Sequence, residues 1–230
     1  MTTGSGGAPS GARARVLDAV RAAVRREPAE AEAEAAARRE EIEARIAAHE
    51  VHVRPSVEGD LAMRFAEKVT LVSASFAPVP GIDGVSRAVA NYLEEHGLEK
   101  EIVVTTDPLV ERVRWSNEFA VARRAAEPED RVSVTGAYAG IAETGTVVFV
   151  SDRTTPTTLN FLPETHVAVL ARDRLVAHLE DVWARLREER AAPPRTVNFI
   201  TGPSRTGDIE LQLELGAHGP RRLHVLLVDA

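Results

Sequence analysis

The chain has 230 residues, of which 44% are hydrophobic and 27% are charged, and its formal net charge at pH 7 is -7. This length and composition allow one ordinary hydrophobic core. The acidic balance argues against sequence-independent binding to nucleic acid or to anionic membranes, because both need a positive protein surface. No segment approaches the roughly 20 apolar residues of a membrane span, so we expect a soluble cytoplasmic protein.

The sequence contains no cysteine. A disulfide scaffold, a thiol nucleophile and thiolate ligation of an iron–sulfur cluster are therefore excluded for this chain. The seven histidines show none of the spacings typical of metal sites. We expect neither a metal site nor a cofactor in this chain.

The N-terminal part has its own composition. Residues 1–11 are small and polar and are predicted to be disordered. Residues 12–50 are rich in Ala, Glu and Arg and are interrupted by Pro28, which predicts an arm of two weakly apolar helices. Such helices could pack on a partner or on a second copy of the chain, and a solvated arm is the alternative. The main domain is predicted to occupy residues 51–230.

Short apolar runs alternate with helical patterns through the main domain. One helix is expected after Asp83, with its end near Gly97, and an amphipathic helix is expected from Leu175 to Leu186. Strands are predicted at residues 69–73, 102–105, 132–135, 147–150, 167–170, 197–200, 209–215 and 223–228.

This alternation predicts a fold of the α/β class, with three α/β/α layers around a mainly parallel sheet. The turn residues at 216–220 separate the last two predicted strands. We expect these two strands to add antiparallel character at one edge of the sheet.

A polar loop follows the strand predicted at 197–200. Gly202 allows close approach of backbone N–H groups to a ligand, and Ser204 and Thr206 add hydroxyl donors. Arg205 can bind a carboxylate or a phosphate through two parallel hydrogen bonds. Asp208 can cap the loop or pair with Arg205, and we prefer the cap. The residues favour an anion-binding loop, although the same composition is ordinary turn chemistry.

Two other segments carry candidate catalytic residues. Glu143 stands among small residues, and a carboxylate with little polar company can serve as acid, base or nucleophile. Thr144, Gly145 and Thr146 follow it and could extend the anion site or only shape a turn. The polar residues 151–155 could line the same pocket. His218, between Ala217 and Gly219, suits proton transfer, although a structural hydrogen bond is the alternative.

Three of these segments together resemble a known family. They are G-P-S-R-T-x-D-I-E from Gly202, L-G-x-H-G-P-R-x-L-H-V from Leu215, and A-E-T-G-T at residues 142–146. They are similar to the lactate-utilisation protein C group of the LUD-domain proteins. The resemblance implies a fold like that of ribose-phosphate isomerases and CoA transferases. It also implies a cytoplasmic protein that works with two iron–sulfur partner proteins to oxidise L-lactate to pyruvate.

Two alternatives remain open. The chain could be a non-catalytic assembly or scaffold subunit, or a sugar-phosphate isomerase or CoA transferase on the same fold. Related CoA transferases use a glutamate nucleophile, but the sequence around Glu143 lacks their motif. Patterns typical of dinucleotide-binding, P-loop and serine-hydrolase sites are absent from the sequence. The ligand expected at the loop is a small carboxylate or a phosphate-bearing molecule, and a homo-oligomer is possible.

Overall fold

The computed structural model describes residues 11–24, 28–48, 53–209 and 212–229, without the side chains of 12, 23, 24, 28–31, 206–209 and 212–215. The chain separates into two compact units, Met1–Val53 and Arg54–Ala230. The first unit contains α1 (Gly11–Val24) and α2 (Pro28–Ala48). Pro28 starts α2, where a missing backbone N–H costs nothing, so the predicted pair of helices around this proline is confirmed.

A six-stranded sheet, in which every neighbouring pair is parallel, forms the centre of the second unit. Its strand order is β1-β12-β7-β4-β2-β3. The strands are β1 (Ser75–Val79), β2 (Glu101–Val104), β3 (Ala120–Arg123), β4 (Val132–Gly136), β7 (Thr165–Ala171) and β12 (Arg222–Val228). The central strands β4, β7 and β12 are buried along nearly their whole length, as expected for a sheet covered on both faces.

A second, four-stranded sheet packs on one face of the first. Its strand order is β8-β5-β6-β9. The strands are β5 (Ala139–Ile141), β6 (Thr146–Val150), β8 (Leu175–Val176) and β9 (Val197–Ile200). Val147 and Phe149 of β6 share one core with Ala168 and Leu170 of β7 and with Val225 of β12. This shared core brings the end of β9 close to the beginnings of β7 and β12.

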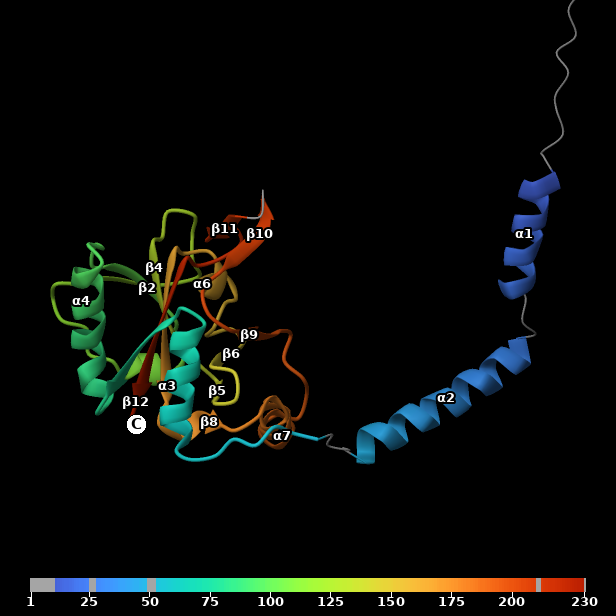
Figure 1. Cartoon of the computed structure of the whole chain (residues 1–230), viewed down its shortest axis with the longest axis horizontal. Coiled ribbons are helices and arrows are strands. Elements are labelled where there is room, and N and C mark those ends of the chain that lie inside the picture. Colours follow the sequence, from blue (N-terminus) through green and yellow to red (C-terminus); the bar gives the residue numbers. More distant parts are fainter. Residues whose placement is uncertain (1–10, 25–27, 49–52, 210–211, 230) are drawn as a thin grey trace, which may run out of the picture. The chain divides into compact units, whose positions relative to one another are not determined.

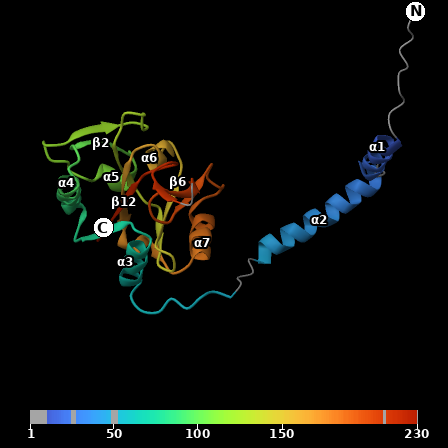
Figure 2. The same cartoon turned by 45° about the horizontal axis from the view of Figure 1, so that its top comes forward.

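Helices cover the outer faces. Helix α4 (Val85–Glu95) packs on the free face of the six-stranded sheet, and α7 (Leu179–Glu189) covers the outer face of the four-stranded sheet. Figures 1 and 2 show these two helices on opposite sides of β12. The short helices α5 (Pro108–Glu111) and α6 (Thr158–Phe161) both contact β4. The predicted α/β fold, with a mainly parallel sheet and flanking helices, is confirmed.

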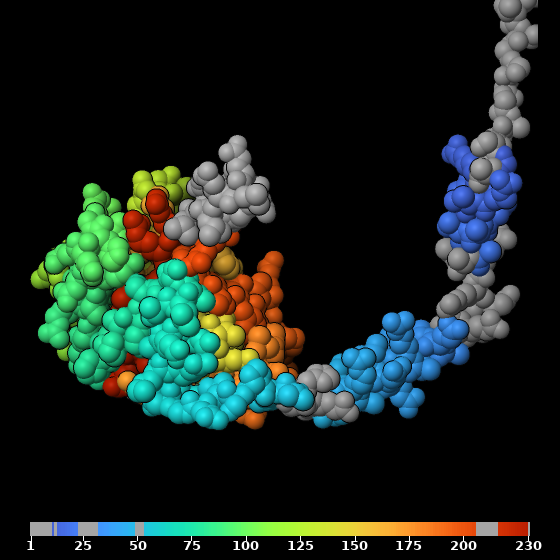
Figure 3. Space-filling view, in the orientation of Figure 1, coloured from blue at the N-terminus to red at the C-terminus, as the bar shows by residue number. Residues whose placement is uncertain are grey.

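Helix α3 (Leu61–Leu71) corrects the strand that was predicted at residues 69–73. Asp60 caps the helix by accepting a hydrogen bond from the Met63 N–H at 2.9 Å. Phe65 and Val69, four residues apart on one side, are fully buried in the core shared with the second sheet. Figure 3 shows the outer side of α3 at the surface, in teal, beside the green surface of α4. A short β-branched run at the end of a helix was mistaken for a strand.

Two helix starts also differ from the prediction. Leu175 and Val176 form strand β8, and α7 begins only at Leu179, because these two residues pair in parallel with β5. Asp83 lies in a short 3₁₀ turn (Ile82–Gly84), and α4 begins at Val85 without a side-chain cap. The predicted end near Gly97 is confirmed, since this residue has the positive φ of +62° for which glycine is favoured.

The C-terminal strands contradict the expected antiparallel edge. Residues 209–215 do not form one strand, because β10 (Arg205–Ile209) and β11 (Gln212–Leu215) pair antiparallel in a separate two-stranded sheet. Strand β12 lies inside the main sheet, parallel to both neighbours. Its six residues after Arg222 are all buried, which is typical of an interior strand and not of an edge. Within the described ranges, no helix is both long and apolar enough to cross a bilayer.

Candidate functional site

A cavity of about 250 Å³ lies where the end of β9 meets the beginnings of β7 and β12. Helix α6 and the residues just before β12 complete its wall. The apolar part of the lining includes Phe161, Phe199 and Leu223. The polar side chains among the described lining residues are Asn160, His166, Thr201, Ser204 and His218. The cavity therefore combines an apolar body with a few polar groups, as small-molecule sites usually do.

Backbone hydrogen bonds join the two C-terminal motif segments at this cavity. The Ser204 N–H donates to the Pro220 carbonyl at 2.8 Å, and the Gly216 N–H donates to the Ser204 carbonyl at 3.0 Å. Gly202, Ser204 and His218 consequently line the same cavity, and the His218 side chain is exposed. The structure thus brings together three of the residues that the sequence singled out.

The rest of the predicted anion loop faces elsewhere or is not described. The exposed Arg205 donates a hydrogen bond from Nη2 to the Val72 carbonyl at the end of α3, with a distance of 2.8 Å, and it is not among the residues that line the cavity. The side chains of Thr206 and Asp208 lie outside the described residues. The cap that we expected from Asp208 therefore stays a prediction.

Glu143 lies in the turn between β5 and β6, next to a histidine. Its Oε2 is 3.0 Å from Nδ1 of His178, and its backbone N–H donates to the Ala177 carbonyl. The expectation that Glu143 has few polar neighbours was wrong, because His178, 35 positions away in the sequence, is a hydrogen-bond partner of its carboxylate. Glu143 does not line the cavity that contains His218, so the two predicted catalytic residues belong to neighbouring substructures.

A chain of hydroxyl groups links the Glu143 turn to the cavity. The Oγ1 atoms of Thr144 and Thr146 are 2.6 Å apart, and those of Thr146 and Thr201 are 2.7 Å apart. Gly145, at the tip of this turn, has φ +71°, and a Cβ there would lie 2.5 Å from the Val69 backbone nitrogen. The turn is therefore fixed against α3 on one side and against the cavity wall on the other.

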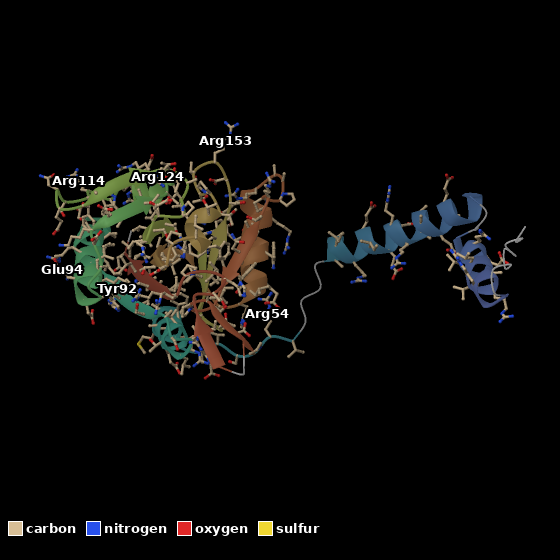
Figure 4. All side chains as sticks on the ribbon, turned by 90° about the horizontal axis from the view of Figure 1, so that it is seen from above. Arg54, Tyr92, Glu94, Arg114, Arg124 and Arg153 are labelled. Atoms are coloured by element: carbon tan, nitrogen blue, oxygen red, sulfur yellow. The ribbon has the colours of Figure 1, made fainter. Side chains whose placement is uncertain are left out.

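Residues 151–155 do not line the cavity. They follow the opposite end of β6 and form a closed loop, in which Asp152 Oδ1 accepts hydrogen bonds from the N–H groups of Thr154 and Thr155 at 2.8 and 3.0 Å. The Thr154 carbonyl accepts a hydrogen bond from the Thr106 N–H. Arg153 projects away from the domain (Figure 4). The expectation that this loop contributes to the same pocket was wrong.

The two most buried polar residues of the cavity, His166 and Asn160, were not predicted from the sequence. The side chain of His166 is fully buried, and its Nε2 lies 2.6 Å from Oγ1 of Thr135. Its Nδ1 has no hydrogen-bond partner among the described residues. Burial lowers the pKa of His166 to about 3, so the imidazole is neutral at ordinary pH.

Asn160, which is 5% exposed, reaches the cavity from α6. Ser133 holds this helix against β4 by donating from Oγ to the Leu159 carbonyl at 2.6 Å. The one available signal for His166 was a histidine at the start of a strand that is otherwise apolar. Only the packing of β9 and α6 over that strand turns the position into a cavity wall.

Known proteins similar to this chain support a common family. The LUD domain profile matches residues 29–228. The chain is 35% identical over 133 residues to lactate utilization protein C of Anoxybacillus flavithermus, covering 57% of this chain and 56% of that protein. It is 32% identical over 117 residues to the Geobacillus thermodenitrificans protein of the same name, covering 50% of this chain and 49% of that protein. The chain thus spans about half the length of these two relatives.

A solved structure supports the fold. The crystal structure of a duf162 family protein from Deinococcus radiodurans matches with a TM-score of 0.54 and 20% sequence identity, covering 76% of this chain and 99% of that one. At this identity the likeness concerns the fold alone. Because the LUD domain profile covers most of the sequence, the chain belongs to the LUD-domain family.

Proposed function

We propose that this chain is the substrate-binding subunit of a cytoplasmic lactate-utilisation system, in which L-lactate is oxidised to pyruvate together with two iron–sulfur partner proteins. Membership of the LUD-domain family and the likeness to lactate utilization protein C support this role. The observation that carries the proposal is the meeting of Gly202, Ser204 and His218 at one cavity, because these residues come from two separate motif segments.

The lining favours a small monocarboxylate over a phosphate-bearing ligand. His166 is neutral, and the described lining residues include no lysine or arginine, so the cavity offers hydrogen-bonding groups and no permanent positive charge. A doubly charged phosphate ester would lose hydration without enough compensating charge, whereas a single carboxylate needs fewer partners. The cavity of about 250 Å³ corresponds to roughly eight water molecules of ~30 Å³ each, so it is large enough to admit a molecule of the size of lactate together with some water.

In this proposal the chemistry is divided between subunits. The oxidation removes two electrons and two protons from lactate, and a chain without cysteine cannot hold an iron–sulfur cluster through thiolates. The partner proteins therefore accept the two electrons, together with the protons released from the hydroxyl group and from carbon 2. His218, on the exposed side of the cavity, binds the carboxylate of lactate. Glu143, held by His178, is a positioning residue, because it fixes the turn whose threonine hydroxyls reach the cavity.

Reconstitution with the partner proteins tests this role. We expect His218→Ala to lower the rate of lactate-dependent reduction of an electron acceptor by about tenfold or more at limiting lactate, as for the loss of a hydrogen bond to a charged group. The control is His96→Ala, because His96 is an exposed histidine that does not line the cavity. Full activity in a combined Ser204→Ala and His218→Ala variant would instead identify the chain as an assembly subunit. Turnover of sugar phosphates or acyl-CoA by the isolated chain would overturn the proposal.

A further inference from the structure

An unpaired nitrogen lies on a residue that forms the wall of the cavity. His166 is 0% exposed, it lines the cavity, and its Nδ1 has no partner among the described residues. Buried polar atoms in proteins nearly always have a hydrogen-bond partner, from the protein, from water or from a ligand. Because His166 lines the cavity, a molecule bound there can supply the partner that this nitrogen lacks.

The polar residues of the cavity form a gradient of exposure. His166 and Asn160 are 0% and 5% exposed, Ser204 is intermediate, and His218 is exposed. The buried end therefore has two hydrogen-bonding side chains without charge, and His218 lies at the solvent end. A charged group on a ligand keeps more of its hydration at the exposed end, while an uncharged polar group is tolerated at the buried end.

We propose that His166 and Asn160 recognise the oxygen on carbon 2 of a 2-hydroxy or 2-oxo monocarboxylate, whose carboxylate lies toward Ser204 and His218. This inference rests on the proposed function for the class of ligand. It adds two specificity-determining residues that no motif contains. It also defines the orientation of the ligand, with the uncharged oxygen at the buried end of the cavity and the carboxylate at the exposed end.

Because the Thr135 hydroxyl can either donate or accept, His166 can form a hydrogen bond with both the alcohol and the ketone form of such a ligand. If Nε2–H donates to Thr135 Oγ1, then Nδ1 is an acceptor and receives a hydrogen bond from an alcohol. If the Thr135 hydroxyl donates to Nε2, then Nδ1–H is a donor to a ketone oxygen. The Asn160 amide also offers both a donor and an acceptor. The same pair can therefore hold the alcohol before oxidation and the ketone after it, with no change of charge in the protein.

Binding to the purified full chain tests the inference, with L-lactate, pyruvate and propionate as probes in calorimetric titrations. Propionate has the same carboxylate and a similar carbon chain but lacks the oxygen on carbon 2. We expect the wild type to bind lactate and pyruvate at least about fivefold more tightly than propionate, the effect of one good hydrogen bond. Equal affinity for the three acids, or no binding of any of them, would overturn the inference.

The decisive variant combines His166→Phe with Thr135→Val, which replaces both hydrogen-bond partners by apolar groups of similar shape. We expect it to lose the preference for lactate and pyruvate over propionate while still binding all three. Thr165→Val is the matched control, because Thr165 Oγ1 is also buried and has no hydrogen-bond partner within the described part of the chain, and Thr165 does not line the cavity. If the double variant does not fold, Asn160→Leu is the second variant, because it removes the other proposed partner of the same oxygen, on α6. If the folded variants keep the preference for lactate and pyruvate over propionate, then His166 and Asn160 do not bind the oxygen on carbon 2.

A spectroscopic measurement separates recognition from mere structural support. The ¹⁵N resonances of the His166 ring, assigned by their absence in the double variant, should shift when lactate binds and should shift differently with pyruvate. Propionate should leave Nδ1 nearly unchanged. Failure of these shifts would overturn the inference without affecting the proposed function, which depends on the rate measured with the partner proteins.

Discussion

Two buried histidines in this domain are held in their neutral form. His166 and His224 lie at the start of neighbouring strands, β7 and β12, and burial lowers their pKa values to about 3 and about 4. His224 is stacked on the ring of Tyr92 at 4.0 Å, so it lies on the other face of the sheet from the cavity. Each ring contributes a polar edge to the core, without a charge, as long as the pH stays above its folded-state pKa.

This burial predicts acid sensitivity. In the unfolded chain a histidine becomes protonated below its ordinary pKa of about 6.5, whereas in the folded chain His166 stays neutral down to about pH 3. The unfolded state therefore binds more protons in this window, and the free energy of unfolding falls as the pH decreases through it. The slope due to His166 approaches ~1.4 kcal/mol per pH unit.

Urea denaturation at several values between about pH 7 and about pH 4.5 measures this slope. The combined His166→Phe and Thr135→Val variant should show a shallower dependence on pH than the wild type. The Thr165→Val variant, which removes no titratable group, should keep the wild-type slope. Identical slopes for all three proteins would mean that His166 is protonated in the folded state.

At the scale of elements, the end of α3 organises the site. The turn after β5 places Gly145 against Lys68 and Val69, and the loop after β9 places Gly202 against Val72. Arg205 adds a hydrogen bond to the Val72 carbonyl. The turn after β5 and the loop after β9 therefore both depend on a close approach of their backbones to the end of α3. Glycine permits this approach because it has no side chain.

A comparison of two glycines tests this role. Gly202 and Gly59 both have positive φ, +79° and +84°, so alanine at either position should cost about 1–2 kcal/mol for the left-handed backbone. A Cβ on Gly202 would also lie 2.4 Å from the Val72 carbonyl oxygen, whereas a Cβ on Gly59 would meet nothing within 4 Å. We expect Gly202→Ala to lower the free energy of unfolding clearly more than Gly59→Ala in denaturant titrations. Equal losses would show that the loop moves away from α3 at little cost.

The elements that could be predicted share a physical property. The runs at 102–105, 132–135, 147–150, 167–170 and 197–200 are short, apolar and bounded by polar or turn residues, and each overlaps a strand. The strand predictions at 69–73 and 209–215 were wrong, because periodicity over a few residues is a weak signal. It does not distinguish the end of a helix from a strand, and it does not distinguish one strand from two strands that pair with each other. Tertiary contacts decided both, through the core around Phe65 and through the pairing of β10 with β11.

At the scale of the whole molecule, the two compact units differ in how much they bury. Val16, Val20 and Ile46 in the first unit are 64%, 53% and 62% exposed. The second unit contains the clusters of buried residues that surround both sheets. The first unit thus contributes little apolar burial, and the second has a core of its own.

Removal of residues 1–53 should therefore leave the domain of residues 54–230 folded. We expect the midpoint of thermal unfolding to change by no more than about 2 °C, because less than about 0.5 kcal/mol of burial is lost. Circular dichroism of the truncated and the full chain measures this. A large fall in the midpoint would show that the N-terminal helices stabilise the domain.

The candidate site was only partly predictable from the sequence. Gly202, Ser204 and His218 stood out because glycine, hydroxyl and imidazole groups are concentrated between apolar strands, and the structure places all three at one cavity. Glu143 stood out in the same way, but its partner His178 did not, because no local pattern connects residues 35 positions apart. For His166 the one signal was a histidine at the start of an apolar strand, and for Asn160 there was none.

The sequence by itself determined the class of the fold, the absence of thiol chemistry and two of the segments that form the cavity. These properties follow from composition and from local periodicity, which act over a few residues. The tertiary structure alone decided that β12 lies inside the sheet and that α3 supports both the turn after β5 and the loop after β9. It also decided that His166 and Asn160 form the buried end of the cavity. The physical reason is that a cavity is made by the order of strands and by the packing of one sheet on another, so its wall joins residues that no pattern along the chain brings together.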